Sequence, residues 1–102
     1  MSDETVGEQT RVELVPSLDH CVQTRAKQEY AATMSRILSG DESPELERRL
    51  ELLKTFLEEA DFSRLRRESE KYLTQGRQVR FVLSGHGGPG NWSLDMKVGE
   101  SG

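Results

Sequence analysis

The chain has 102 residues, a formal net charge of −4, 33% hydrophobic residues and 31% charged residues. This length fits one domain, since domains most often contain about 100–150 residues, and the hydrophobic content is too high for a wholly disordered chain. Apolar runs do not exceed three residues, as at 81–83. A membrane helix needs about 20 apolar residues and a signal peptide about 7–15, so we expect neither.

The single cysteine, Cys21, cannot form an internal disulfide. A lone thiol is typical of a reducing compartment, so the sequence predicts a cytoplasmic protein that does not enter the membrane. We expect a flexible acidic tail over residues 1–10, one domain over residues 11–98, and a flexible C-terminal tail over residues 99–102.

The first element in chain order is a short strand. Residues 11–15 alternate polar and apolar side chains before Pro16, with Val12 and Leu14 on one face. A helix is expected next, capped by Ser17 or Asp19 and running to about Ser39. Its apolar positions recur every four residues, at Leu18, Val22, Ala26, Tyr30, Met34 and Leu38.

A second helical region begins clearly, because Ser43 offers an N-cap and Pro44 suits the first helical position. Residues 44–75 form either one kinked helix or a helical hairpin, and the poor helix formers near Asp61 favour a break there. The first part carries a leucine stripe at four-three-four-three spacing, made of Leu46, Leu50, Leu53, Leu57 and Ala60 and widened by Leu52 and Phe56. The second part, residues 63–75, places Leu65, Ser69, Tyr72 and Leu73 on one side.

The C-terminal part changes its hydrophobic period from 3.6 to 2. Val79, Phe81 and Leu83 alternate with polar or smaller residues, and the same alternation returns at Trp92, Leu94, Met96 and Val98. The glycine-rich segment 85–91 between them predicts a β-hairpin. The expected fold class is therefore α+β, with two or three amphipathic helices packed on a small antiparallel sheet. That sheet consists of the hairpin, with the N-terminal strand as a candidate third member.

The glycine-rich loop is the first candidate for chemistry. Such loops can bind phosphate through exposed backbone N–H groups, but here a strand follows instead of a helix, and Pro89 lacks an N–H. A structural hairpin turn is the favoured interpretation. His86 at its tip is a weak candidate for ligand binding, metal binding or proton transfer.

His20 and Cys21 are the second candidate, because both are metal-ligand types. Neighbouring helical positions diverge by about 100°, so we do not expect them to share one ion. A catalytic pair of Cys21 with His86 is unsupported, and Cys21 fits a small buried hydrophobe. We expect no metal site and no cofactor.

The third candidate is an uneven charge distribution. Residues 41–61 contain eight acids and three bases, whereas residues 62–83 contain six bases and two acids. The second segment could bind nucleic acid or an acidic partner, or it could be ordinary solvated helix surface. Its basic residues are Arg64, Arg66, Arg67, Lys71, Arg77 and Arg80.

The leucine stripe has two interpretations, a helix face buried on the sheet or a face shared between subunits, and the first is favoured. No coherent catalytic set is visible, so we do not expect an enzyme. The sequence favours a non-catalytic protein-interaction or regulatory module, with a protein partner or a homodimer, that uses charged helical surfaces. A small nucleic-acid-binding protein using residues 64–80 is the first alternative, and a small enzyme or ligand binder centred on residues 85–91 is the second.

Overall fold

The computed structural model describes residues 10–85 and 90–99. Within them, strand β1 and three helices precede a pair of C-terminal strands, so the α+β fold class is confirmed. The elements in chain order are β1 (Thr10–Leu14), α2 (Val22–Leu38), α3 (Pro44–Glu59), α4 (Phe62–Leu73), β2 (Val79–Gly85) and β3 (Trp92–Val98).

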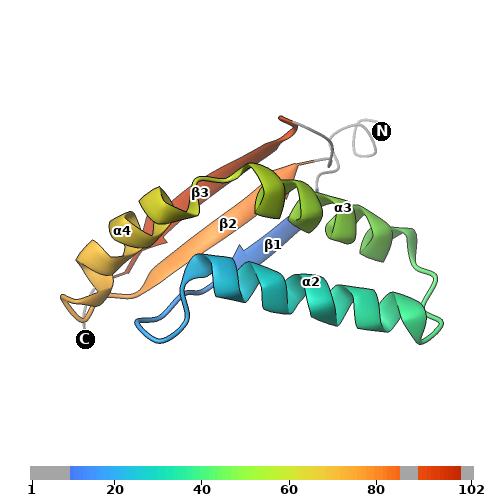
Figure 1. Ribbon diagram of the computed structural model, residues 1–102, viewed down its shortest axis with the longest axis horizontal. Helices are drawn as coiled ribbons and strands as arrows, with labels where there is room; N and C mark the ends of the chain where they lie inside the picture. Colours follow the sequence, from blue (N-terminus) through green and yellow to red (C-terminus); the bar gives the residue numbers. More distant parts are fainter. Residues whose placement is uncertain (1–9, 86–89, 100–102) are drawn as a thin grey trace, which may run out of the picture.

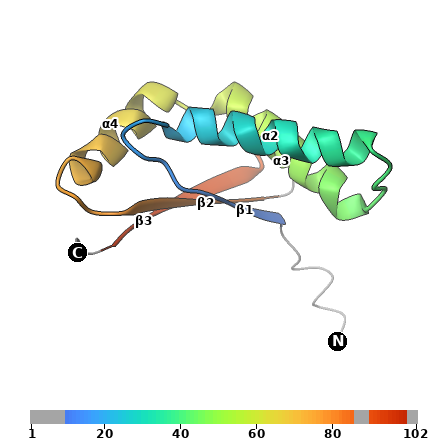
Figure 2. The ribbon, with the colours of Figure 1, turned by 90° about the horizontal axis from the view of Figure 1, so that it is seen from below.

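The sheet is antiparallel with the order β1-β2-β3, so the C-terminal hairpin is joined by the N-terminal strand (Figure 1). Leu14 pairs with Phe81, and Phe81 pairs with Met96, which sets the register across the sheet. Figure 2 shows all three helices on one face of the sheet. The opposite face is uncovered within the described residues.

The core lies between the sheet and the helices. Because side chains alternate between the two faces of a strand, the apolar positions that the sequence analysis placed together point toward the helices. The buried residues of this core are Val12 and Leu14 of β1, Val79, Phe81 and Leu83 of β2, Val22 and Ala26 of α2, and Leu52, Leu53 and Phe56 of α3.

Residues 44–75 form two helices, which settles the alternative left open by the sequence. Helix α3 begins as expected, because the Ser43 side chain accepts a hydrogen bond from the backbone N–H of Glu45 at 3.3 Å. It ends at Glu59, and the Asp61 side chain accepts from the N–H of Arg64 at 3.2 Å to cap α4. A carboxylate at this position stabilises the new helix start.

The predicted start of α2 was wrong: neither Ser17 nor Asp19 caps it, and the N-cap is Cys21. Ser17 instead closes a turn with His20, whose N–H lies 3.1 Å from the Ser17 hydroxyl and 3.3 Å from its carbonyl oxygen. Leu18 is therefore not on the helix, and 61% of its surface is exposed.

The far end of α2 also leaves the core. Four residues turn a helix by about 40° more than one full turn, so the row from Val22 to Leu38 rotates by about 160°. Val22 and Ala26 are buried, whereas Leu38 is 78% exposed. Thr33 takes the buried position, with its hydroxyl donating to the Glu29 carbonyl oxygen at 2.8 Å.

No helix among the described residues has the length and apolar character needed to cross a membrane.

Candidate interaction site at the edge of β3

Strand β3 lies at one edge of the sheet, and its outer side carries a regular row of backbone groups beside which residues 10–85 and 90–99 place no strand. The N–H of Gly99 donates to the carbonyl oxygen of Gln78 at 2.8 Å, which continues the β2–β3 register by one pair. Backbone groups alternate between the two sides of a strand. The odd-numbered residues from Ser93 therefore face β2, and the even-numbered residues Trp92, Leu94, Met96 and Val98 direct their N–H and C=O groups to the free edge.

The same even-numbered residues direct their side chains toward the helices, yet these side chains are only half-buried. Trp92, Leu94 and Met96 line a groove of about 380 Å³ between β3 and the start of α4. Its lining is largely apolar, with charges on the α4 side, and consists of Ala60, Asp61, Arg64, Leu65, Glu68, Phe81, Trp92, Leu94 and Met96. An unpaired strand edge thus borders an open apolar groove.

The other edge of the sheet is less suited to receive a strand. Strand β1 has five residues, against seven in β3, and the chain reaches Pro16 two residues after β1 ends. Proline cannot donate to a ladder and ends pairing at a sheet edge. Within the described residues, β3 therefore offers the longer uninterrupted edge.

Glu59 fixes the start of β3 beside the groove. One carboxylate oxygen of Glu59 accepts from the Trp92 indole N–H at 2.7 Å and from the backbone N–H of Gly90 at 3.0 Å. The Trp92 ring also packs edge-on against Phe56, with ring centroids 5.3 Å apart. The last residue of α3 therefore holds the end of the hairpin loop and the first residue of β3.

These two hydrogen bonds favour the ionised carboxylate, so they lower the pKa of Glu59 below its usual value, with the Gly90 N–H as the larger cause. A lowered pKa in the folded state stabilises the fold above the unfolded-state pKa of about 4.3, and this stabilisation is lost as pH falls through the lower folded pKa.

We expect Glu59→Gln to lower the free energy of unfolding at neutral pH, and to have the same free energy of unfolding as the wild type in acid. Urea unfolding of both proteins from pH 7 to pH 3 measures this difference; an unchanged difference across that range would contradict the prediction.

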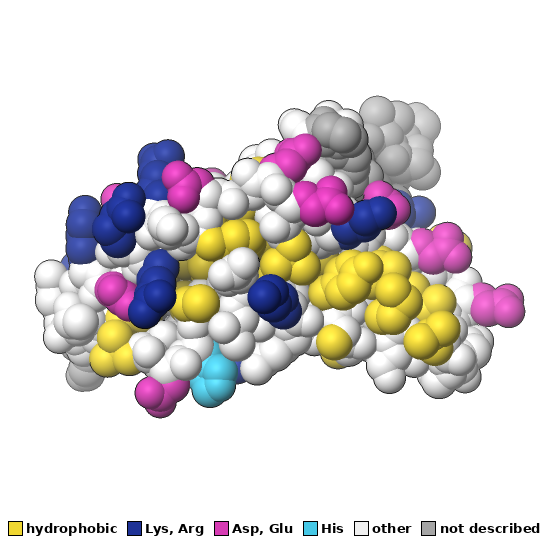
Figure 3. All heavy atoms as spheres, in the orientation of Figure 1, with side chains coloured by type: hydrophobic (Ala, Val, Ile, Leu, Met, Phe, Trp, Pro, Cys, Tyr) yellow, Lys and Arg dark blue, Asp and Glu magenta, His cyan; other side chains and the backbone are white. Residues whose placement is uncertain are grey.

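The four basic candidates on α4 lie on its exposed surface (Figure 3). Arg66 pairs with Glu70 at 3.1 Å, and Lys71 lies 3.5 Å from Glu68. No ion pair involves Arg64 or Arg67 within the described residues. Exposed pairs of this kind contribute little to stability.

Of the other two basic candidates, Arg77 lies against α4, and Arg80 is separated from this group. Arg77 is half-buried, with its guanidinium 5.4 Å from the centre of the Tyr72 ring and its Nε donating to the Gly99 carbonyl oxygen at 3.0 Å. Arg80 faces outward from β2 on the uncovered face of the sheet, where it lies 3.6 Å from Glu13. Residues 64–80 therefore do not present their six bases on one continuous surface.

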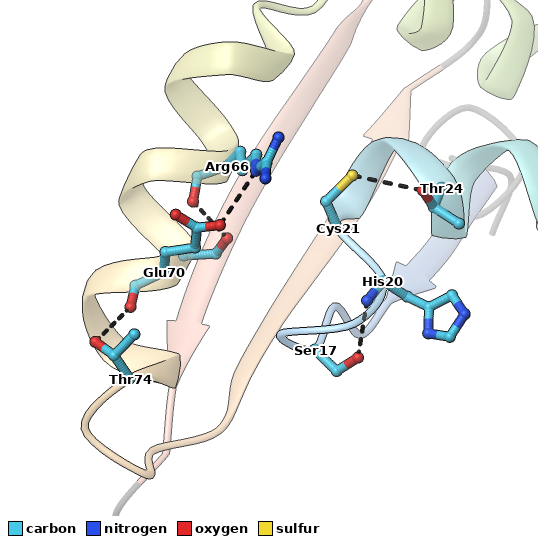
Figure 4. A network of polar contacts seen from close by, with 8 residues as sticks. Ser17, His20, Cys21, Thr24, Arg66, Glu70 and Thr74 are labelled. Carbon is cyan, nitrogen blue, oxygen red and sulfur yellow. Dashed lines mark hydrogen bonds and ion pairs between the residues drawn. The ribbon is translucent and has the colours of Figure 1, made fainter.

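His20 and Cys21 lie in the turn before α2 and at its N-cap (Figure 4). His20 is exposed, and Cys21 is half-buried, with its sulfur 3.5 Å from the Thr24 hydroxyl. This hydrogen bond is the largest cause of a lowered pKa of the Cys21 thiol, and partial burial opposes it. The backbone N–H groups of Thr24 and Gln23 and, least of all, the charge of Arg66 on α4 also lower this pKa. His86 lies outside the described residues. Within them, no three His, Cys, Asp or Glu residues cluster as metal ligands.

The helical face carries exposed apolar surface over the C-terminal half of α2 and the N-terminal half of α3 (Figure 3). Met34, Ile37 and Leu50 are half-buried there, and Leu38 is exposed. The leucine stripe thus divides: Leu46 and Leu53 are buried in the molecule, as the favoured interpretation expects, while Leu50 remains accessible.

A charged cleft of about 370 Å³ lies between α2, α3 and β1. Its charges largely pair within the molecule, since Arg49 donates to Glu29 at 2.7 Å and Arg36 donates to Asp41 at 3.0 Å. This pairing leaves a weaker reason for ligand binding than the groove beside β3, where half-buried apolar side chains adjoin backbone groups that no described strand pairs with.

The sequence analysis did not identify the β3 edge or the role of Glu59. Alternation in residues 92–98 predicted the strand, but which of its two edges is free depends on sheet order, which a single hairpin does not reveal. Glu59 and Trp92 are separated in the sequence by helix α4, strand β2 and the glycine-rich segment. The one available signal was an acid at the end of a helix, where a negative charge is unfavourable unless it has another partner.

A protein-family model matches residues 10–93 of the chain, which include β1, the three helices and β2. An uncharacterized protein of Archaeoglobus fulgidus is 43% identical over 51 residues, and the match covers 47% of this chain and 60% of the archaeal protein. The chain therefore spans less than two thirds of the length of this relative. No solved structure matches the chain.

Proposed function

The chain belongs to the protein family whose model spans residues 10–93, and we propose that it is a protein-interaction module that pairs the free edge of β3 with an extended segment of a protein partner. Strand addition to a sheet edge is a common recognition mode, in which main-chain hydrogen bonds provide affinity and alternate side chains provide specificity. The observation that carries the proposal is that the outer edge of the seven-residue strand β3, which no described strand pairs with, has an apolar groove beside it.

The geometry supports this mode because both components of recognition lie on the same residues. Leu94 and Met96 present backbone N–H and C=O groups to the edge and half-buried side chains to the groove. An added strand would satisfy the first and cover the second. Glu59 holds Trp92 at one end of this surface through a 2.7 Å hydrogen bond, so the edge is positioned before a partner arrives.

The charged helical surfaces favoured by the sequence remain an alternative location for partner binding. Nucleic-acid binding by residues 64–80 also stays a prediction, with less support because Arg80 lies on the uncovered face of the sheet, apart from the bases of α4. An enzyme or ligand site in residues 85–91 stays a prediction whose central residue, His86, lies outside the described residues.

The proposal is tested by placing a photoreactive amino acid at Ser93, on the outer face of β3, and at Arg67, on the exposed surface of α4. Both proteins are cross-linked in native cell extract. We expect Ser93 to give a discrete protein adduct. We also expect Met96→Pro to abolish this adduct, because proline removes an N–H that faces the free edge while leaving the ladder to β2 intact.

Lys97→Pro is the matched comparison, since its N–H faces β2. It should unfold the hairpin, whereas Met96→Pro should keep the near-ultraviolet circular dichroism of Trp92. A Ser93 adduct that persists in a folded Met96→Pro variant would overturn the proposal. So would protein adducts that form from Arg67 alone, which would place the binding surface on the helices.

A further inference from the structure

The two charged residues of β3 lack ionic partners within the described part of the chain. Asp95 and Lys97 point outward from the uncovered face of the sheet and are exposed. In the β2–β3 register, Asp95 lies opposite Val82 and Lys97 lies opposite Arg80. Like charges placed directly across a ladder are unfavourable, and Arg80 already has Glu13 at 3.6 Å on its other side. The edge strand therefore holds one negative and one positive charge, two positions apart, and neither has an ionic partner among the residues that the structure describes.

We propose that the segment that pairs with β3 is β3 of a second copy of this chain, antiparallel, with the two-fold axis at Met96. This inference rests on the proposed function and names its partner. In this register, Asp95 of each copy lies opposite Lys97 of the other, because a two-fold interface makes every contact twice. Each Lys97 thus gains a neighbouring carboxylate to offset Arg80.

The backbone permits this register. Met96 faces the free edge, so Met96 of the two copies exchanges both backbone hydrogen bonds at the axis. Leu94 of one copy and Val98 of the other form the next hydrogen-bonded pair, again from residues that face the edge. Their side chains point to the helix side in both copies, so apolar groups from the second copy extend over the exposed end of each groove.

Charge complementarity selects this register from its neighbours. Moving the axis one residue to Asp95 places the two Asp95 carboxylates opposite one another. Moving it to Lys97 places two ammonium groups together, and repulsion disfavours both arrangements. The charges on the α4 side of the groove are not all of one sign, since Arg64 and Glu68 carry opposite charges. They therefore do not disfavour the approach of a second copy as a whole. The result is one continuous sheet with the helices of both copies on the same face.

The test measures mass in solution by sedimentation across a protein concentration series. Wild-type protein should form dimers that weaken as salt rises, because the exposed pairs are screened. Asp95→Lys and Lys97→Asp should each weaken dimerisation at least about tenfold, since each turns both attractive pairs into repulsive ones.

The decisive measurement mixes the two variants in equal amounts. Chains with opposite charges at both positions restore both attractive pairs, so the mixture should form a heterodimer more tightly than either variant dimerises with itself. This recovery also shows that both variants are folded. The double variant Asp95→Lys with Lys97→Asp should dimerise with itself for the same reason.

Three results would overturn the inference: a wild-type chain that stays monomeric, a dimer that neither charge variant weakens, or a mixture that fails to associate. A monomeric chain whose Ser93 cross-links to a different protein, in a manner that Met96→Pro abolishes, would leave the proposed function standing and remove only this inference. In that case, Asp95 and Lys97 would serve as charges that protect an edge strand from self-pairing.

Discussion

Replacing Phe56 by alanine is expected to destabilise the fold by about 3–5 kcal/mol, a large part of the roughly 5–15 kcal/mol that holds a typical domain together. The Phe56 side chain is 0% exposed at the centre of the core. Its ring packs edge-on against both Phe62 and Trp92, with centroids 5.2 and 5.3 Å away. The substitution removes buried apolar surface and leaves a cavity between α3 and the first residues of α4 and β3. Urea unfolding followed by Trp92 fluorescence measures the loss.

Leu38→Ala is the matched control, because it also shortens a large apolar side chain but at a position that is 78% exposed. Its effect on the free energy of unfolding should stay within about 0.5 kcal/mol. Comparable losses from both substitutions would mean that Phe56 does not occupy the core as described.

The second large effect is expected at Gly85, where β2 ends. Its φ is +153°, a conformation that side chains disfavour, and a Cβ built there would overlap the carbonyl oxygen of Asn91 and lie 2.8 Å from the Cα of Trp92. Strain of this kind costs about 1–3 kcal/mol, and overlap with backbone atoms costs about as much again. Gly85→Ala should therefore open this end of the hairpin, which is seen as a lower unfolding midpoint and a shifted Trp92 emission.

Substitutions at two other glycines separate the cost of an unfavourable φ from the cost of steric overlap. Gly90 has a φ of +74° with no atom near a built Cβ, so Gly90→Ala should show the conformational cost alone. The nearest atom to a Cβ at Gly99 is Gln78 Cβ at 3.6 Å, an ordinary contact, so Gly99→Ala should be neutral or slightly stabilising. The expected order of destabilisation is Gly85, then Gly90, then Gly99. Equal effects at Gly85 and Gly90 would show that the overlap is relieved without cost.

The fold was largely predictable because local signals agreed with the global arrangement. Ser43 and Pro44 mark a helix start by themselves, and the change of hydrophobic period after Gly76 marks the hairpin. The break near Asp61 was also accessible, since an acid followed by a new amphipathic segment is typical of an N-cap. Strand β1 was expected from only a few alternating residues, and Val12 and Leu14 do pack in the core.

The errors came from features that depend on tertiary structure. Leu18 fits the four-residue row of α2, but the turn closed by Ser17 and His20 keeps it off the helix. Two further features were not visible in the sequence. The basic segment is continuous in the sequence, yet a strand alternates its faces, and Arg80 therefore points away from α4. Which edge of β3 is free depends on the strand order, and that order depends on where β1 pairs.

That pairing also has a kinetic consequence. Strands β2 and β3 are joined by a short loop, whereas β1 pairs with β2 across all three helices. Closing a long loop costs more entropy than closing a short one, and non-local pairing slows folding. On the ribosome, β1 is made before its neighbour β2 and cannot pair until the three helices and β2 have followed it. We therefore expect the helices and the hairpin to assemble before β1 docks, so that β1 is made before β2 and β3 but joins them last.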